Sequence, residues 1–249
     1  MKNIIVYDVE TTGRSYHFDQ ILQISAVLLD ENLNQLDEID FRSRLLKGII
    51  PHISALQTNG LSYNQLTQSN MSSYEMIKEV EETFKKWSPA IFVGHNSTAF
   101  DDNFLRLSLY KNLRKPYITN TNGSQRGDSL LLARATSVFS PNAINVPRNS
   151  RGTKVFSLGL LADANNIHLT NAHDALADVK ATASLLSLIK KQAPEMWRSF
   201  LLTTSKKGAS EFMQSHSYFC FAPTPSQASV LKYCCDNNDT SKNETYHFN

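Results

Sequence analysis

The sequence predicts an α/β protein in which a mixed central sheet is flanked by helices. The elements indicated by the residue pattern follow the order strand, strand, strand, helix, strand, helix, helix, helix. Strands that alternate with helices in this way are typical of a sheet covered by helices. The chain has 249 residues, of which 41% are hydrophobic and 19% charged, so it can form one substantial globular domain with a small appendage.

Three strands are expected at the start of the chain. Residues 4–10 are mostly β-branched and apolar, and residues 11–13 interrupt the run, so we expect a central strand that ends in a turn. Residues 21–30 and 36–46 continue as two further strands around a turn at residues 31–34. The three segments therefore predict a β-meander.

A helix is expected from about residue 72 to residue 87. Ser72 and Glu75 have the spacing of a capping box, and Pro89 ends the helix. Apolar and aromatic residues at helical spacing give this helix one buried face: Tyr74, Ile77, Val80, Phe84 and Trp87.

Strand, loop and helix alternate along the next part of the chain. Residues 90–93 predict a short buried strand, and residues 101–113 predict a helix with leucines at four-residue spacing. The segment from residue 115 to residue 155 is irregular apart from a predicted helix at 128–139. Two more helices are expected, at residues 157–165 and about 175–191.

The character of the chain changes near residue 205. We therefore expect one domain at residues 1–204 and a C-terminal extension at residues 205–249. Within the extension, residues 218–221 predict a short strand, and residues 236–243 are polar and are expected to be disordered. This extension is a candidate surface for a protein partner.

Composition excludes several classes of protein. No apolar run is long enough to span a membrane and no signal peptide is evident, so we expect a cytoplasmic protein that does not bind membranes. The three cysteines, Cys220, Cys234 and Cys235, lack the spacing of metal ligands or of a disulfide framework. A net charge of +2 neither requires nor excludes a polyanionic partner.

Asp8 and Glu10 are the first candidate site residues. Side chains two positions apart on a strand point to the same face, so both carboxylates should leave one side of the central strand near its end. Two carboxylates that close repel each other and need a cation, and oxygen ligands favour Mg²⁺ or Mn²⁺. Taken alone, the pair is a weak signal, because strands often end in solvated acids.

Asp101 and Asp178 extend this acidic pattern. Asp101 begins the helix after the second buried strand, where it is either a site residue or an acid favoured by the helix dipole; the dipole alone can explain Asp102. Asp178 lies on the apolar stripe of the helix at 175–191, so its carboxylate should face inward and needs a metal ion or a basic partner.

His173 precedes Asp178 by five residues, which on one helix would place the two side chains about 140° apart. We therefore expect His173 in the preceding loop or the first turn, away from the helix face of Asp178. A histidine there is either a surface residue or a general base for a water molecule.

Three segments together resemble the exonuclease motifs of the DEDDh family, the DnaQ-like exonucleases. They are residues 6–13, 94–102 and 171–179, with the sequences VYDVETTG, GHNSTAFDD and NAHDALADV. Within the family the chain is most similar to the exonuclease domain of the bacterial exonuclease I group, because its second motif is one residue longer than in proofreading subunits and its third closely matches that group. The similarity covers about residues 3–200.

The resemblance implies an RNase H-like fold and two Mg²⁺ ions, for which Mn²⁺ could substitute. Asp8, Glu10, Asp101 and Asp178 would be the metal ligands, and His173 would be the general base. The reaction would release nucleoside 5′-monophosphates from a free 3′ end.

The resemblance also implies that the nucleic acid contacts Thr11, Thr12, Gly13 and Asn96. Gly13 would allow close approach of the backbone, although residues 11–13 could also form only an ordinary turn.

Two further segments could bind nucleic acid. Arg148 and Arg151 lie with Lys154 in a loop containing Gly and Asn, and they are candidate contacts for the phosphate backbone. Tyr16 and Phe18 follow the first motif and could either stack on a base or belong to the packing.

Three functions stay open at this point. The leading hypothesis is an enzyme that degrades DNA from its 3′ end, with single-stranded DNA as the expected substrate and RNA as the alternative. The second is a subunit that binds nucleic-acid ends without cutting, against which the five intact catalytic positions argue. The third is a nuclease effector domain of a larger assembly, such as an antiphage system.

Two differences from exonuclease I limit which of its properties can be expected of this chain. Exonuclease I has an aromatic residue where this chain has Thr12, and it continues through an SH3-like and a helical domain, whereas this sequence stops at Asn249. Processivity and a strong preference for single strands therefore do not follow from the resemblance.

Overall fold

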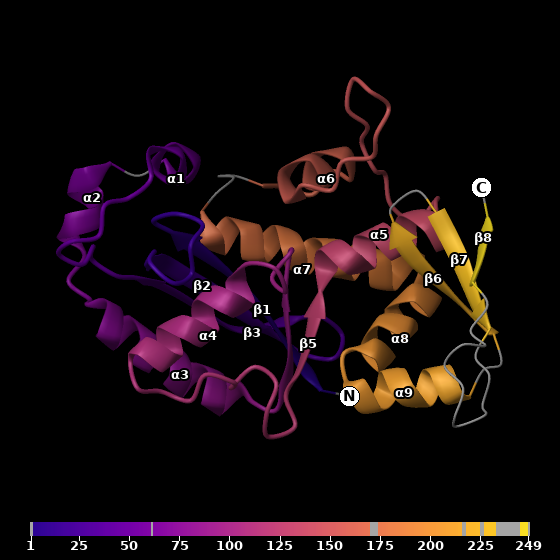
Figure 1. Ribbon diagram of the computed structural model, residues 1–249, viewed down its shortest axis with the longest axis horizontal. Coiled ribbons are helices and arrows are strands. Elements are labelled where there is room, and N and C mark those ends of the chain that lie inside the picture. Colours follow the sequence, from indigo (N-terminus) through magenta and orange to yellow (C-terminus); the bar gives the residue numbers. More distant parts are fainter. Residues whose placement is uncertain are drawn as a thin grey trace. The chain divides into compact units, whose positions relative to one another are not determined.

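Residues 3–128 contribute a five-stranded sheet with the strand order β3-β2-β1-β4-β5. Figure 1 labels β1, β2, β3 and β5 of this sheet. β1 pairs antiparallel with β2, as β2 does with β3, whereas β1 and β4, and β4 and β5, pair in parallel. The strands are β1 (Asn3–Thr11), β2 (Ile21–Leu29), β3 (Gln35–Arg42), β4 (Ala90–Gly94) and β5 (Gln125–Asp128). The predicted meander and the mixed sheet are both confirmed.

The computed structural model describes residues 2–60, 62–169 and 174–215 in full, and the backbone of residues 218–224, 227–232 and 245–248. The chain divides into two compact units. The first consists of residues 1–128 and 168–184, and the second of residues 129–167 and 185–249. The domain boundary expected after residue 204 stays a prediction.

The two faces of β1 have different neighbours. Ile5, Tyr7 and Val9 point to one face, where they form a buried core with residues of α3 (Ser73–Trp87) and α4 (Asp101–Lys111). The even-numbered positions point to the other face, which begins with the apolar Ile4 and ends with the acidic Asp8 and Glu10. The acidic positions therefore lie on the face opposite the main core.

The helices of the first unit are α1 (Ile53–Asn59), α2 (Tyr63–Gln68), α3 (Ser73–Trp87), α4 (Asp101–Lys111) and the first part of α7 (Ala175–Gln192). The predicted capping box is confirmed, because Ser72 accepts from the Glu75 backbone N–H while the Glu75 side chain accepts from that of Ser72. Tyr74, however, is an exposed residue rather than part of the buried face.

Several elements differ from the sequence-based expectation. The helix expected at 101–113 ends at Lys111, because Leu113 adopts a positive φ of 57°, which no α-helix can contain, and is 95% exposed. The strand β5 was missed because it has only four residues. The helix α1 was missed because it has no buried residue and so shows no apolar stripe.

The second unit contains helices and a small sheet. Its helices are α5 (Ser129–Phe139), α6 (Leu158–Ala164), the last part of α7, α8 (Pro194–Thr203) and α9 (Lys206–Gln214). The antiparallel strands β6 (Tyr218–Thr224), β7 (Gln227–Lys232) and β8 (Thr245–Phe248) form the sheet. The strand expected at 218–221 is confirmed and extends to residue 224, whereas the polar segment 236–243 lies outside the described residues.

No helix among the described residues is both long enough and apolar enough to span a membrane.

Candidate active site

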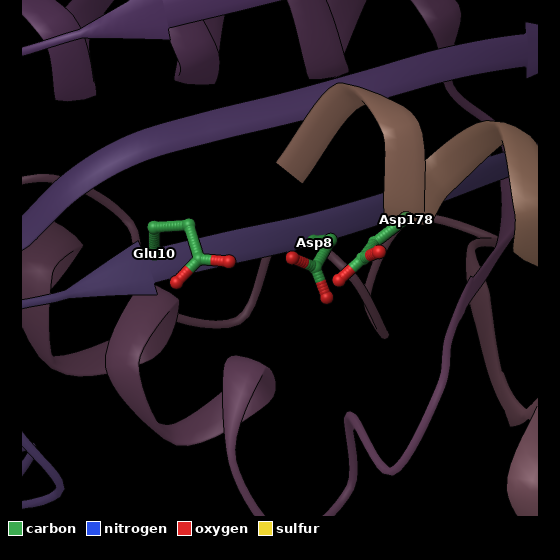
Figure 2. Close-up of side chains that lie close together, drawn as sticks. All are labelled: Asp8, Glu10 and Asp178. Atoms are coloured by element: carbon green, nitrogen blue, oxygen red, sulfur yellow. The ribbon is translucent and has the colours of Figure 1, made fainter. Parts of the chain in front are cut away.

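Three carboxylates meet on the even-numbered face of β1. Asp8 and Glu10 leave this strand side by side, and Asp178 reaches toward them from the first turns of α7 (Figure 2). One oxygen from each of the three lies within 4.8 Å of the other two. Residues separated by about 170 positions in the chain therefore present their charges to a single point.

Asp178 takes this place because of the periodicity of its helix. Ala181 and Leu185 follow it at helical spacing and are fully buried, so the same stripe that packs the helix directs Asp178 inward. Its backbone N–H donates to the Asp174 carbonyl at 3.0 Å, which is the first regular turn of α7. The inward orientation predicted from the sequence is thus found in the structure.

Asp101 joins the site through a backbone contact. β4 pairs with β1 only as far as Val6, so the N–H of Val9 lies beyond the end of that pairing and donates instead to the Asp101 carboxylate at 3.0 Å. Asp101 is 3% exposed and lines the same cavity as the other three acids. The fourth predicted carboxylate is therefore fixed against the strand that carries Asp8.

Asp102 has a different environment although it is the next residue in the chain. It accepts hydrogen bonds from the Tyr7 hydroxyl and from Arg126, whose guanidinium lies 3.2 Å away. Tyr7 points into the main core, so Asp102 ties α4 to the face opposite the acidic site. The structure thus gives Asp102 side-chain partners that the sequence did not predict, and the helix-dipole explanation of this residue stays a prediction.

The loop between β4 and α4 is held by Asp128 at the end of β5. Its carboxylate accepts from the backbone N–H of Asn96 at 3.0 Å and from both the N–H and the hydroxyl of Thr98, at 3.1 and 2.9 Å. Asn96 has a positive φ of 69°, which asparagine tolerates better than most residues. The loop that leads into Asp101 is therefore held by a buried acid from a neighbouring strand.

The electrostatics of the site favour a bound cation. Burial raises the pKa of Asp8 well above its usual value, and the charges of Asp101, Glu10 and Asp178 raise it further. Burial, followed by the charge of Asp178, raises the pKa of Glu10 to about 8, and burial raises that of Asp101 to about 7. The charge of Arg42 lowers the pKa of Glu10 but does not offset the effect of burial, and oxygen ligands of this kind suit a hard divalent cation. The residues present therefore fit a divalent metal site.

The turn after β1 forms one wall of the site. Thr12 is fully buried, and its hydroxyl donates to the buried Asp19 at 2.9 Å while accepting from the Gln20 N–H. A Cβ at Gly13 would lie 2.5 Å from Asp19 Oδ2 and 2.4 Å from His52 Cδ2. A side chain at position 13 would therefore require both neighbours to shift, and Asp19 is held in place by Thr12 and the Ser15 N–H.

The acids line a cavity of about 1000 Å³. Its walls come from β1, the turn after β1, α1 and the β4–α4 loop. Besides the four acids, the lining residues are Val9, Thr11, Gly13, Arg14, Ser15, Tyr16, His17, His52, Ser54, Ala55, Thr58, Asn59, His95, Asn96 and Phe100.

Only some of the predicted nucleic-acid contacts line the cavity. Thr11, Gly13 and Asn96 line the cavity, whereas the Thr12 side chain is buried beneath it. Tyr16 also lines the cavity and packs edge-on against Phe104, so this aromatic residue serves both the packing and the cavity wall. Phe18 is 81% exposed and is not among the lining residues.

The basic loop belongs to the second unit. The Arg148 guanidinium donates to the Gly152 carbonyl within the same turn. Lys154 Nζ donates to the Ser137 carbonyl at 2.9 Å, near the end of α5. Arg151 is exposed. A phosphate contact at Arg148 or Arg151 stays a prediction.

His173, the predicted general base, lies outside the described residues.

Several residues around the site were not predicted from the sequence. Asp128 ends a strand parallel to β4, so recognising residues 125–128 as a strand would have predicted its carboxylate at the same sheet edge. Arg42 belongs to a run of charged residues with period two on β3, which marks one polar face. No local signal distinguishes Asp19 or His52 from ordinary loop residues.

Comparison with known proteins relates this chain to exonucleases. An exonuclease family model, of the RNase T type, matches residues 5–186. Exodeoxyribonuclease I of Buchnera aphidicola subsp. Schizaphis graminum is 32% identical over 200 residues, a match that covers 80% of this chain and 41% of the relative. Exodeoxyribonuclease I of Haemophilus influenzae is 30% identical over 207 residues, covering 82% and 44%.

The fold has a counterpart among solved structures. The structure of E. coli exonuclease I in complex with a dT13 oligonucleotide matches with a TM-score of 0.81 and 25% sequence identity, over 85% of this chain and 46% of that one. The expected RNase H-like exonuclease fold is thereby confirmed. The chain spans less than half the length of each of these three proteins.

Proposed function

The chain belongs to the RNase T exonuclease family, and on this basis, together with its acidic cavity, we propose that it is a metal-dependent 3′→5′ exonuclease acting on DNA. One observation carries the proposal most directly. Asp8 and Glu10 of β1 and Asp178 of α7 bring carboxylate oxygens within 4.8 Å of one another, on a cavity that Asp101 also lines. The intact acidic cluster argues against a subunit that binds ends without cutting.

The four carboxylates are assigned as ligands of two Mg²⁺ ions, for which Mn²⁺ would substitute. The raised pKa values of Asp8, Glu10 and Asp101 support this assignment, because a bound cation would favour the ionised form of each of these groups. When bound, the ions would supply the positive charge that stabilises a phosphoryl-transfer transition state.

His173 is assigned as the general base. In the sequence, His173 directly precedes Asp174, which lies at the start of α7. Its sequence position is therefore next to the helix that carries Asp178. His173 would take the proton of the attacking water, whose oxygen bonds to phosphorus while the bond between phosphorus and the 3′ oxygen breaks. The 3′ oxygen keeps the electron pair and gains a proton, which yields a nucleoside 5′-monophosphate and a strand shortened by one residue.

Single-stranded DNA is the proposed substrate. The names of the relatives support DNA, and the bound oligonucleotide of the E. coli enzyme supports an unpaired strand. In the cavity, Thr11, Gly13 and Asn96 would contact the terminal nucleotide, while Thr12 would hold the turn through Asp19. Tyr16 and Phe100 offer aromatic faces on which a base could stack.

Other parts of the proposal concern the rest of the chain. Arg148 and Arg151 are proposed to contact the phosphate backbone of the nucleic acid. Residues 1–204 are proposed as the exonuclease domain, and residues 205–249 as an extension that binds a protein partner. The cytoplasmic location expected from the sequence is kept as a prediction.

The test uses purified protein with Mg²⁺ and 5′-labelled single- and double-stranded DNA and RNA. We expect single-stranded DNA to shorten from its 3′ end with release of nucleoside 5′-monophosphates, and a circular single strand to resist. Cutting of the circular strand would identify an endonuclease. Faster shortening of RNA than of DNA would identify RNA as the substrate. Tight binding of ends without release would favour the binding subunit, and release only after addition of a partner would favour the effector domain of a larger assembly.

A further inference from the structure

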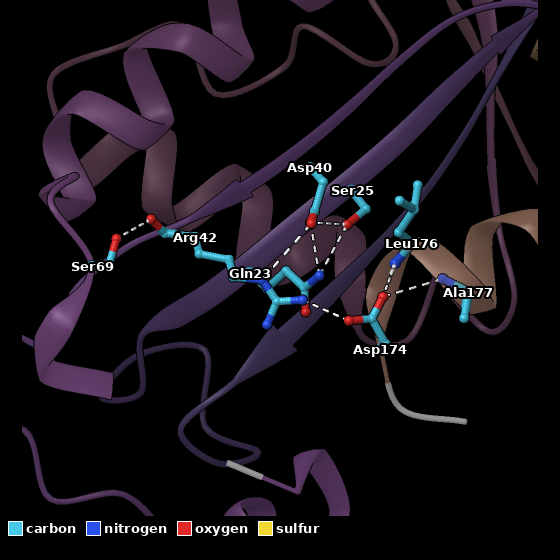
Figure 3. A network of polar contacts seen from close by, with 8 residues as sticks. All are labelled: Gln23, Ser25, Asp40, Arg42, Ser69, Asp174, Leu176 and Ala177. Carbon is cyan, nitrogen blue, oxygen red and sulfur yellow. Dashed lines mark hydrogen bonds and ion pairs between the residues drawn. The ribbon is translucent and has the colours of Figure 1, made fainter. Parts of the chain in front are cut away.

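Arg42, at the end of the edge strand β3, binds Asp174 at the start of α7. The guanidinium Nη2 lies 2.6 Å from Asp174 Oδ2, and 132 positions separate the two residues in the chain. Figure 3 shows this contact within a group of polar side chains on the sheet and at the helix start.

Asp174 organises the first turn of α7. Its Oδ1 accepts from the backbone N–H of Leu176 at 3.2 Å and of Ala177 at 3.4 Å, and its carbonyl accepts from the N–H of Asp178. N–H groups at a helix start have no partner within the helix, so an acid at this position stabilises the turn. Burial would raise the pKa of Asp174, but hydrogen bonding and charge from Arg42 lower it, so the group stays ionised and keeps this acceptor.

The register of the sheet connects this contact to the acidic site. Gln23 lies opposite Glu10 on one side and opposite Arg42 on the other, so the three side chains share one face. Ser25 likewise lies between Asp8 and Asp40. One row of polar residues therefore runs from Glu10 through Gln23 to Arg42, which binds Asp174, and a parallel row runs from Asp8 through Ser25 to Asp40.

Arg42 is held in place by its own neighbours. Its carbonyl accepts from the Ser69 hydroxyl at 2.6 Å, and its Nε lies 3.8 Å from Asp40 Oδ2. Asp40 in turn accepts from Gln23 Nε2 and Ser25 Oγ, each at 2.7 Å (Figure 3). The guanidinium is thus oriented by a network rather than by a single flexible contact.

We infer that Arg42 is a positioning residue for the reaction: through Asp174 it fixes the first turn of α7, and thereby the place of Asp178 opposite Asp8 and Glu10. This inference rests on the proposed function, since it concerns the acids assigned there as ligands. The Arg42 and Asp174 side chains are 41% and 33% exposed, so their ion pair stabilises the whole fold little. Its effect should be on geometry at the site.

The chain contains a matched control. Lys180 and Glu38 form a second ion pair between the same two elements, at 3.1 Å and with similar exposure of 49% and 42%. Glu38 lies opposite Val27, beyond the rows that contain Asp8 and Glu10. Loss of this pair removes one bridge between β3 and α7 without disturbing the first turn of the helix.

The first measurement does not require turnover. Hydrogen exchange is followed in the metal-free wild type and in the variants Arg42→Ala and Lys180→Ala. We expect Arg42→Ala to accelerate exchange of the amides of residues 176–178 severalfold, with little change later in α7 or in melting temperature. Lys180→Ala should leave these amides as in the wild type.

The second measurement is a cycle of steady-state kinetics with Arg42→Ala, Asp174→Asn and the double variant. We expect each single change to lower kcat roughly 10- to 100-fold with a smaller change in KM, because displacement of a site residue by about 1 Å can cost that much. The double variant should be no slower than the worse single one. Arg42→Lys should recover part of the rate, and Lys180→Ala should match the wild type.

The two measurements separate the inference from the proposed function. Wild-type protein without Mg²⁺-dependent release would refute the function, while the exchange experiment would still test Arg42. The inference is wrong if exchange at residues 176–178 is unchanged in Arg42→Ala, if the two single changes add fully, or if Lys180→Ala produces the same losses.

Discussion

The backbone N–H of Val9 donates a 3.0 Å hydrogen bond to the carboxylate of Asp101, which joins the start of α4 to the strand that carries Asp8 and Glu10. The contact forms only because β4 stops pairing with β1 at Val6 and leaves the Val9 donor free for a side chain. The end of a parallel strand thus becomes the place where a carboxylate from the next helix can enter the site.

This contact distinguishes two neighbouring acids that differ little in the sequence. We expect Asp101→Asn to lower kcat by more than about 100-fold, because even residues that only support a metal ligand typically cost 10- to 100-fold. Its amide oxygen can still accept from Val9, so the free energy of unfolding should change little. Asp102→Asn should have a near-normal kcat but a free energy of unfolding lower by about 1 to 3 kcal/mol, because the substitution weakens the hydrogen bonds from Tyr7 and Arg126. Urea unfolding and single-turnover cleavage check both; equal kinetic losses would refute the distinction.

Removal of one charge from the cluster should separate activity from stability. Asp8→Asn or Asp178→Asn should abolish Mg²⁺-dependent release, yet the melting temperature of the metal-free protein at pH 8 should stay level or rise, because repulsion between carboxylates decreases. Added Mg²⁺ should raise the melting temperature of the wild type but not of these variants. Asp163→Asn, at an exposed acid of α6, is the control for loss of one charge. Metal-dependent activity in either cluster variant would disprove the ligand assignment.

Stability of the metal-free protein should depend on pH through the same acids. The pKa of Glu10 rises from 4.5 to about 8 in the folded protein, so the folded state binds the proton more tightly than the unfolded state does. This contribution to stability is complete below the unfolded pKa and is lost as pH rises through the folded pKa. We therefore expect the free energy of unfolding, measured in urea with a chelator, to fall between pH 5 and pH 9, with a smaller fall in Glu10→Gln. Equal falls in both proteins would contradict the assignment, and saturating Mg²⁺ should flatten the wild-type curve.

The acid that holds the β4–α4 loop should matter for both folding and catalysis. Asp128→Ala removes the acceptor of three hydrogen bonds from Asn96 and Thr98, so we expect a loss of about 2 to 4 kcal/mol in the free energy of unfolding. The rate should fall as well, because this loop leads into Asp101. Asp128→Asn, which keeps one acceptor oxygen, should lie between the wild type and Asp128→Ala in both measurements. A stable Asp128→Ala protein with full activity would show that the loop does not need this acid.

His173 should contribute to proton transfer rather than to metal affinity. General-base assistance is typically worth about 10² to 10⁴-fold, so His173→Ala should lower kcat by that factor while the Mg²⁺ concentration for half-maximal rate barely moves. Part of the lost rate should return at higher pH, where hydroxide replaces the missing base. Full recovery on raising Mg²⁺ alone would instead identify His173 as a ligand.

Local patterns in the sequence determined a large part of this protein. The period of two along residues 4–10 placed Asp8 and Glu10 on one face of a strand, and the helical period placed Asp178 above Ala181 and Leu185. Both inferences need only the geometry of a single element, which is why they agree with the structure. Short elements such as α1 and β5 were not predicted, because few or none of their residues are buried and their sequences therefore show no apolar periodicity.

The tertiary structure alone decided which side chains meet. The motif resemblance favoured Asp101 over its neighbour Asp102, but only the structure shows that Asp101 accepts from Val9 of β1, beyond the end of the β4 pairing, while Asp102 accepts from Tyr7. The contact between Arg42 and Asp174 joins residues 132 positions apart, and strand register places it beside Glu10. Such pairs depend on how strands and helices are stacked, and no periodicity within one segment contains that information.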